Sequence, residues 1–495
     1  MKRIETRVLA ARCLCGVMAL MLAAPASAHD LWIRDVTVIS PERVEPLPHA
    51  TVKIHDARIS AIVADAGPTP KGVQAIEASG RFLVPGLIDG HVHLREIPGM
   101  RRDQEQEHPA VAAAARAQFP KSYLYFGFTT LVDLISNPEH MAVWSANPLR
   151  PDTYFCGGVP VKDGYPSNFV PVEMRYQYMP YYLLAPGQAA PAGVDPKQHT
   201  AAAVVERMKA DGAICVKTFY ESGFGPNHDL PLPSDALMRE LVDSAHAAHL
   251  PVLMHANSTV AQEFALRSGV DIIAHGLWNW RQPGDVAVLT PDVTAVLDRV
   301  QRRQVGYQAT IQVLYGERGL FDRQFLANPL MAKAAPAGLI AWYESPEGQW
   351  YHDVFAKNLG VAANASPEVD RVAIARVDNV VAYLAKRQAR FLFGSDTPSD
   401  QTFANPPGLN GHLEMQRLIE AGMSPTQLLM AATLANARAF GLERDIGSVE
   451  VGKRANLLLL AADPLSGAQA FDHISEVILG GRVLEPASLA ADGKP

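Results

Sequence analysis

The stretch Pro85-Gly86-Leu87-Ile88-Asp89-Gly90-His91-Val92-His93-Leu94 carries two histidines, one residue apart, at the end of an apolar run. The run predicts a buried β-strand, and Pro85-Gly86 marks its start. Because side chains alternate faces along a strand, His91 and His93 point the same way and can bind one metal ion. Two polar residues on the exposed face of a strand would have the same spacing, so the pair alone leaves both interpretations open.

Seven more short apolar runs follow this one, and helical patterns separate most of them. The eight runs are residues 87–94, 129–135, 153–157, 213–219, 251–256, 270–275, 305–311 and 390–396, and helices are expected at 234–249, 259–268, 293–303 and 369–387. Eight such alternations predict an α/β fold with a (β/α)8 TIM-like barrel rather than an open doubly wound sheet.

The two ends of the chain have a different pattern. Short strand-like pieces joined by Pro, Gly and Asp occupy residues 31–39, 51–55, 57–63, 82–84, 455–460 and 476–484. They predict a small β-sandwich domain built from residues 29–84 and 441–495, with the barrel of residues 85–440 inserted between them.

Two connections are too long to be ordinary loops, namely residues 158–197 and 312–367. Long loops on the C-terminal side of a barrel are often lids or pocket walls, although surface decoration or a subunit contact would explain them equally well. The first connection is rich in tyrosine, and we expect a lid from Tyr165, Tyr176, Tyr178, Tyr181 and Tyr182.

Residues 1–28 have the pattern of a secretory signal peptide, with a basic start, a short apolar core and the site Ala26-Ser27-Ala28. We therefore expect a periplasmic or secreted protein that has no membrane span after signal removal, and an uncleaved anchor is the alternative. Cleavage changes the formal net charge from -7 to -10, which gives no reason to expect nucleic acid or an anionic membrane as a partner. Cys156 and Cys215 remain, and we expect both to be buried free thiols.

Four more candidate ligands stand at the ends of predicted strands. Lys217 ends the fourth strand, His255 the fifth, His275 the sixth and Asp396 the eighth. Each could have a structural role, because single histidines are often hydrogen-bonded core residues and Asp396 could cap the turn at Thr397-Pro398. A buried lysine needs a stronger reason, since an unpaired ammonium is costly inside a protein. In a barrel, all these strand ends meet at one face, so the set predicts a metal site.

The chain resembles the amidohydrolase superfamily, in the branch of imidazolonepropionase-like and prolidase-type binuclear metal hydrolases. The resemblance rests on residues 85–93, 211–217, His255, His275-Gly276, Gly394-Ser395-Asp396, and on residues 433–439 through 446–456. Asn456 departs from the pattern, which usually has aspartate there, but it lies outside the metal site. The resemblance implies that His91, His93 and Asp396 hold one divalent ion, that His255 and His275 hold another, and that Lys217, carbamylated by carbon dioxide, bridges them.

The nitrogen and oxygen donors suit zinc best, with manganese or cobalt as alternatives. We expect a metal-activated hydroxide to attack an amide of a dipeptide, N-acyl amino acid or related small molecule, with Asp396 transferring the proton to the leaving nitrogen. Tyr220 could stabilise the oxyanion or simply pack, and Trp278, Trp280 and Arg281 could line the substrate pocket or anchor a loop. The alternatives are a lactone, carbamate ester or phosphotriester hydrolase, or a catalytically silent ligand-binding barrel. The resemblance also implies a homo-oligomer.

Overall fold

The computed structural model describes residues 30–224, 228–281, 287–322, 324–360, 370–399 and 401–492. The predicted signal peptide lies outside these ranges. Among the described residues, no helix combines the length and apolar character that crossing a membrane requires.

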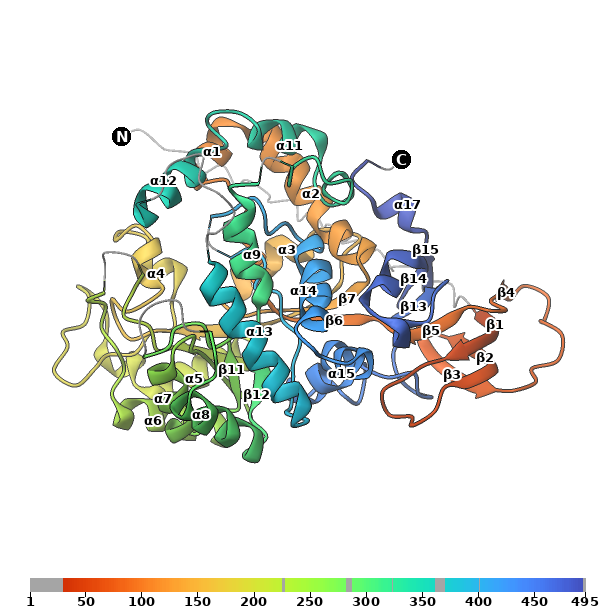
Figure 1. Cartoon of the computed structure of the whole chain (residues 1–495), viewed down its shortest axis with the longest axis horizontal. Coiled ribbons are helices and arrows are strands. Elements are labelled where there is room, and N and C mark those ends of the chain that lie inside the picture. Colours follow the sequence, from red (N-terminus) through yellow and green to blue (C-terminus); the bar gives the residue numbers. More distant parts are fainter. Residues whose placement is uncertain are drawn as a thin grey trace, which may run out of the picture.

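The centre of the molecule is a curled sheet of seven parallel strands in the order β12-β11-β10-β9-β8-β7-β6 (Figure 1). The strands are β6 (Leu87–Val92), β7 (Phe128–Asp133), β8 (Asp152–Val159), β9 (Cys215–Phe219), β10 (Val252–His255), β11 (Ile272–Ala274) and β12 (Gly306–Gln308). Nearly all their residues are buried, as expected for parallel strands covered on both faces. Seven of the eight predicted strands are thereby confirmed.

The eighth predicted strand, residues 390–396, has no regular strand geometry but connects both edges of this sheet. On one side Leu392 N donates to Tyr307 O of β12 at 3.0 Å. On the other side Asp396 N donates to His91 O at 2.7 Å, and His93 N donates to Thr397 O at 2.6 Å. This arrangement is consistent with a closed barrel. The pairing is irregular because Asp396 has a φ of 57°, outside the strand region.

Helices surround the curled sheet (Figure 1). The predicted helices are confirmed as α6 (Asp235–Ala247), α7 (Thr259–Ser268), α8 (Pro291–Arg302) and α13 (Arg371–Lys386). Ser234 and Ser258 cap α6 and α7 by accepting hydrogen bonds from the backbone of Leu237 and Ala261. The other helices are α1 (Arg102–Glu107), α2 (Pro109–Tyr125), α3 (Pro138–Ser145), α4 (Arg175–Tyr178), α5 (Ala201–Ala210), α9 (Ile311–Gly319), α10 (Met331–Ala334), α11 (Ala337–Tyr343), α12 (Trp350–Leu359), α14 (Leu409–Glu420), α15 (Pro425–Met430), α16 (Asn436–Ala439) and α17 (Pro486–Leu489).

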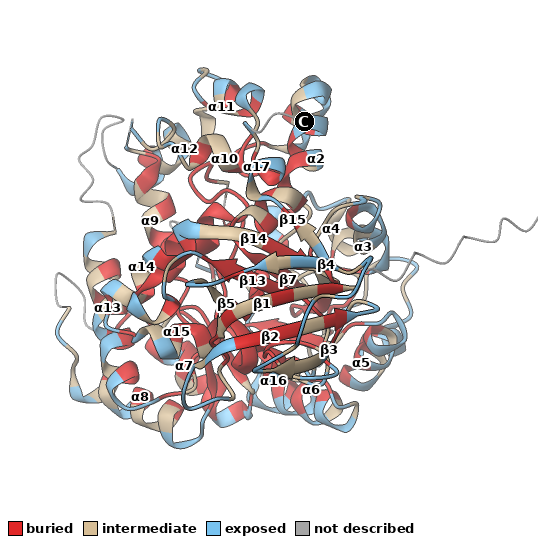
Figure 2. Cartoon of the chain, turned by 90° about the vertical axis from the view of Figure 1, so that its right-hand side faces the viewer, coloured by how far each residue is buried: buried red, intermediate tan, exposed pale blue. Residues whose placement is uncertain are grey.

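Strands from both ends of the chain form a second sheet, in the order β15-β14-β13-β5-β1-β2-β3, with β4 paired to β1 (Figure 2). Its strands are β1 (Leu31–Val38), β2 (Leu47–His55), β3 (Arg58–Val63), β4 (Gln74–Glu77), β5 (Phe82–Pro85), β13 (Leu457–Leu460), β14 (Ile474–Leu479) and β15 (Arg482–Leu484). The two ends join where β13 pairs antiparallel with β5. The described strands form one hydrogen-bonded sheet, so the separate two-layered sandwich that we predicted is not confirmed.

Residues 476–484, predicted as one strand-like piece, are the last part of β14, a turn and the whole of β15. Gly480 and Gly481 have φ values of 56° and 77° and form the turn between β14 and β15. A two-residue hairpin turn with two positive φ angles favours glycine, which explains the Gly-Gly pair.

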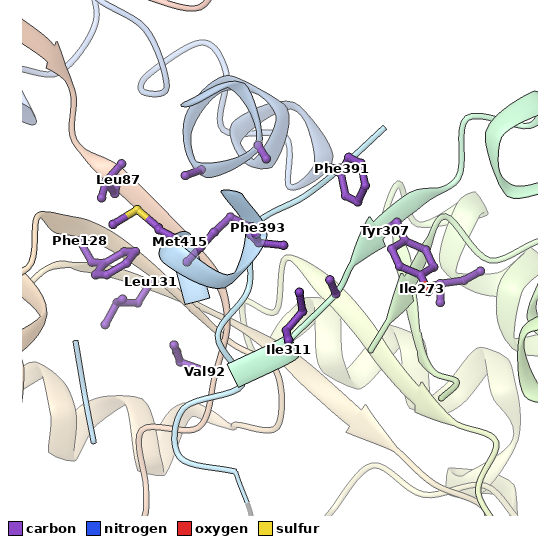
Figure 3. Packing of buried hydrophobic residues seen from close by; sticks show 14 of the residues in the cluster. Leu87, Val92, Phe128, Leu131, Ile273, Tyr307, Ile311, Phe391, Phe393 and Met415 are labelled. Atoms are coloured by element: carbon purple, nitrogen blue, oxygen red, sulfur yellow. The ribbon is translucent and has the colours of Figure 1, made fainter. Parts of the chain in front are cut away.

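The core that positions the candidate site packs the irregular eighth segment against β7 and α14. Figure 3 shows Phe128 beside Phe393, whose rings stack with centroids 5.6 Å apart, and Met415 of α14 close to both. All three side chains are fully buried. This packing fixes the segment that carries Asp396.

Cys156 of β8 and Cys215 of β9 form a disulfide, so the prediction of two free thiols is wrong. The two residues lie directly opposite each other in the sheet, with Cα atoms 4.5 Å apart, and both are fully buried. Burial could be predicted from the apolar runs, but the register between two strands 59 residues apart could not.

Candidate metal centre

Three predicted ligands meet at one point. His91 Nε2 and His93 Nε2 each lie 3.0 Å from Asp396 Oδ1, and the ligand atoms of the three residues are all within 4.8 Å of one another. The two histidines stand on consecutive inward positions at the end of β6, and Asp396 comes from the eighth segment. The strand-end geometry expected from the sequence therefore brings the first three groups together.

The other three predicted ligands continue this cluster. Lys217 Nζ lies 3.3 Å from His91 Nε2, and His275 Nδ1 lies 3.7 Å from Asp396 Oδ2. The His255 ring is next to His275, with centroids 4.4 Å apart. Six side chains from five strand ends thus form one contiguous group, which we call the six-residue cluster.

Burial sets the protonation of this cluster. Burial lowers the pKa of Lys217 to about 7 and that of His91 to about 3, so the imidazole is neutral near neutral pH and the lysine is easily deprotonated. Burial alone would raise the pKa of Asp396, but His91, His93 and His275 together hold it well below its usual value. Burial likewise lowers the pKa of His255 and His275, whereas Asp396 raises the pKa of His93 despite its burial. Neutral imidazoles and an ionised carboxylate are the forms that bind metal ions, so binding at His93 releases its proton.

Gln308 of β12 determines the tautomer of His91. Its Nε2 donates to Gly90 O at 3.1 Å, which places Oε1 3.2 Å from His91 Nδ1. Nδ1 must then carry the proton, and the lone pair of neutral His91 is on Nε2, facing Asp396 Oδ1. Two acceptor atoms 3.0 Å apart repel each other, and either a proton or a metal ion between them removes the repulsion. The donor set therefore fits a divalent cation.

The backbone is unusual at three residues around the cluster. His275, Asp396 and Thr310 have φ values of 80°, 57° and 45°, in the left-handed region that non-glycine residues rarely adopt. Strained backbone of this kind concentrates at functional sites. Gly394 is required nearby, because a Cβ there would lie 2.6 Å from the Cβ of His91.

Sequence reasoning missed several buried residues that support the cluster. Thr310 Oγ1 lies 3.1 Å from His275 Nδ1. Asp89 accepts hydrogen bonds from the backbone of His91 and Ser395, and burial raises its pKa to about 7. The polar pair Gln308 and Thr310 at the end of the seventh predicted strand was a usable signal, because that strand end faces the same site as the others.

Not all predicted site residues join the cluster. The ring of Tyr220 stacks on Phe264 of α7 at 4.1 Å, which favours its packing role. Trp278 lies beside His275 with ring centroids 5.8 Å apart. Trp280 donates to Leu277 O at 2.8 Å, and Arg281 pairs with Glu263 of α7, so these two residues are held within the loop and against a helix.

Of the five tyrosines expected in a lid, Tyr165 reaches the cluster. Its ring lies 4.7 Å from that of His255. Tyr176 and Tyr181 donate hydrogen bonds to Asp163 and Asp211, and the remaining two contact other rings or cations: Tyr178 packs under Arg95 and Tyr182 stacks on His199. Three of these tyrosines therefore contact residues outside the connection, and one ring of the connection contacts the candidate site.

We expect Gln308→Met to weaken metal binding by about 10- to 100-fold, because methionine keeps the shape but cannot fix the His91 tautomer. Isothermal titration calorimetry of the metal-free protein with zinc measures this change in affinity. Gln262→Met is the matched control, since Gln262 is equally buried and donates to Ala256 O and Tyr307 Oη without contacting the six-residue cluster. Equal metal affinity in the two variants would contradict the positioning role.

Comparison with known proteins identifies relatives of the chain. A model of the amidohydrolase family matches residues 82–277 and 349–484, more than half of the chain. Adenine deaminase from Paracoccus denitrificans (strain Pd 1222) is 42% identical over 74 residues, which are 15% of this chain and 12% of that protein. The chain therefore covers only a small part of that relative's length.

Two solved structures share the fold over nearly the whole chain. A Xaa-Pro dipeptidase with bound methionine has a TM-score of 0.63 and 19% identity, covering 92% of this chain and 100% of that one. Phenylurea hydrolase B has a TM-score of 0.63 and 21% identity, covering 94% and 100%. At these identities the likeness establishes a common architecture, which is compatible with many substrates.

Proposed function

Because this chain belongs to the amidohydrolase family, we propose that it is a metal-dependent hydrolase that cleaves the C–N bond of a small amide. The observation that carries the proposal is the convergence of His91 Nε2 and His93 Nε2 on one oxygen of Asp396. The substrates that we propose are dipeptides, N-acyl amino acids or related amides.

We assign His91, His93 and Asp396 to one divalent ion and His255 and His275 to a second, with Lys217 between them. Zinc fits this set of nitrogen and oxygen donors best. Two such ions, when bound, acidify a water molecule and polarise a carbonyl group. The burial of five of these side chains supports the assignment, because it keeps competing water away from the donors, and the sixth, His93, is partly buried.

We propose that Lys217 is carbamylated. Its pKa of about 7 leaves a substantial fraction of free amine at neutral pH. The amine nitrogen forms a bond to the carbon of carbon dioxide, and one amine proton leaves to solvent, which yields an anionic oxygen donor. This modification removes the like-charge conflict between an ammonium group and divalent cations.

In this proposal Asp396 is the proton carrier. Its carboxylate is ionised, and it would take the proton of the attacking water and then deliver it to the departing nitrogen. His93 and His275 flank the two carboxylate oxygens and keep the group oriented toward the cluster. Asp89 joins β6 to the irregular eighth segment, because it accepts hydrogen bonds from both His91 N and Ser395 N.

We also propose that the protein is secreted or periplasmic and that it acts as a homo-oligomer. The Cys156–Cys215 disulfide supports the first part, because disulfides persist in oxidising compartments. The basic and apolar start of the chain supports it as well. Sequencing the amino terminus of the exported protein tests this, and His29 is the expected first residue.

Metal removal tests the hydrolase function. We expect dialysis against a chelator to abolish cleavage of a panel of Xaa-Pro dipeptides, basic dipeptides and N-acyl amino acids, and zinc to restore it. Metal analysis should then give two ions per chain. Lactones, carbamate esters and paraoxon complete the panel. If the metal-loaded protein cleaved one of these three compound classes but no amide, the amide proposal would be overturned.

A further inference from the structure

Three aromatic rings contact His255 and a fourth contacts one of them, and we call Tyr165, Phe169, Phe219 and Phe224 the aromatic cluster. Tyr165 is at its centre, with ring centroids 5.8 Å from Phe169, 5.8 Å from Phe219 and 5.5 Å from Phe224. Three of the rings also contact His255 directly, at 4.7 Å for Tyr165, 6.3 Å for Phe219 and 6.2 Å for Phe224. The cluster is therefore continuous with the candidate metal centre.

The rings of the aromatic cluster differ in exposure. Phe219 on β9 is 5% exposed, whereas Phe224 is 41% and Phe169 is 61% exposed. Single exposed apolar residues are common, but two phenylalanines that contact the same ring beside a candidate active site form a patch. An apolar ligand that covers such a patch gains binding free energy from the aromatic surface that it buries.

The aromatic cluster comes from segments that follow adjacent strands. Tyr165 and Phe169 lie in the connection after β8, and Phe224 lies just beyond β9. In parallel α/β folds, the connections after the strands form the substrate-binding face. The position of the cluster thus agrees with a role in binding rather than in the core.

The charge beside the cluster disfavours an anionic ligand group. Glu221 Oε2 lies 3.6 Å from His255 Nε2, and its Oε1 accepts a hydrogen bond from Gly223 N at 2.9 Å. A carboxylate held at this point repels a substrate carboxylate. A neutral apolar group is therefore the best occupant of this side of the site.

We propose that the aromatic cluster binds an aryl group of the amide substrate, so that the preferred substrates are amides with an aromatic substituent next to the cleaved bond. This inference rests on the proposed amide hydrolase function and adds the substrate class. Phe224 and Phe169 cover the aryl group, Tyr165 forms its inner wall, and Glu221 excludes acidic groups.

Equilibrium binding with ligands that have no cleavable amide tests the proposal independently of turnover. One pair, N-benzenesulfonylglycine and N-methanesulfonylglycine, places the aryl group on the acyl side. A second pair, N-(2-phenylethyl)methanesulfonamide and N-ethylmethanesulfonamide, places it on the amine side without a carboxylate that Glu221 would repel. We expect the metal-loaded wild-type protein to bind the aryl member of one pair about tenfold more tightly.

Phe224→Ala and Phe169→Ala should reduce this difference to less than about threefold, while Phe224→Trp preserves it. Phe355→Ala in α12 is the control for an aromatic residue outside the cluster. Thermal melts of the Phe224 variants should match the wild type, because that ring is partly exposed.

The outcomes separate this inference from the proposed function. Equal affinity for aryl and alkyl ligands in both pairs, or an aryl preference that survives Phe224→Ala and Phe169→Ala, overturns the inference even if amides are cleaved. Absence of amide cleavage by the metal-loaded protein overturns the proposed function, and with it the assignment of the aryl group to an amide substrate.

Discussion

Asp396→Asn is expected to lower kcat at least about 100-fold, because the amide cannot accept the proton of the attacking water. The wild-type carboxylate is ionised near neutral pH, since three histidines hold its pKa well below the usual value despite burial. Asparagine has the same shape and retains an oxygen close to His91 and His93. Steady-state kinetics on the best amide of the panel, combined with metal analysis of the same sample, measures the effect.

Asp133→Asn is the matched control for this experiment. Asp133 is another buried carboxylate at a strand end, but its oxygens accept hydrogen bonds from the backbone of Leu94 and Ile135. An amide can keep one of these bonds, so we expect kcat to stay within about tenfold of the wild type. If Asp396→Asn kept full activity with a normal metal content, Asp396 would not be the residue that transfers the proton.

The arrangement of the six-residue cluster could be predicted because each member stands at or near the carboxyl end of a predicted strand. Parallel strands bring their carboxyl ends to one edge, so the positions of Lys217, His255 and His275 along their own strands were enough to place them together. The prediction needed only local patterns. It did not need the register between strands or the path of any connection.

The same alternation, applied more strictly, would have placed Tyr220 correctly. Lys217 and Phe219 share the inner face of β9, so the next residue points outward, where Tyr220 stacks on Phe264. The same reasoning could also have identified Gln308 as a residue of the site, because it is polar and stands at the end of the seventh strand.

Other features depend on contacts between distant parts of the chain, and local patterns do not encode them. The Cys156–Cys215 disulfide requires the register of β8 against β9, and the joined second sheet requires β13 to pair with β5. The aromatic cluster depends on the conformations of two connections. Loops have no periodic pattern, and their shape follows from packing on the finished scaffold.

Lys217→Ala is expected to lower activity at least about 100-fold and to reduce the metal content below two ions per chain, because the proposed bridging ligand is lost. Lys217 is 1% exposed, and its truncation leaves a space next to His91 Nε2. A small carboxylate has the donor atoms of a carbamate and fits a space left by a lysine side chain. Propionate added at millimolar concentration should therefore restore part of the activity and the second ion.

Lys217→Met separates this ligand role from the effect of simply removing a buried lysine. Methionine fills the space, so propionate should restore nothing to that variant. Lys453→Met is a second control, because Lys453 is also buried but pairs with Glu450 beside the other sheet. It should lower stability without changing the metal content. If Lys217→Met bound two ions and turned over amides normally, Lys217 would not be a bridging ligand, and the two-ion assignment would require another anionic donor.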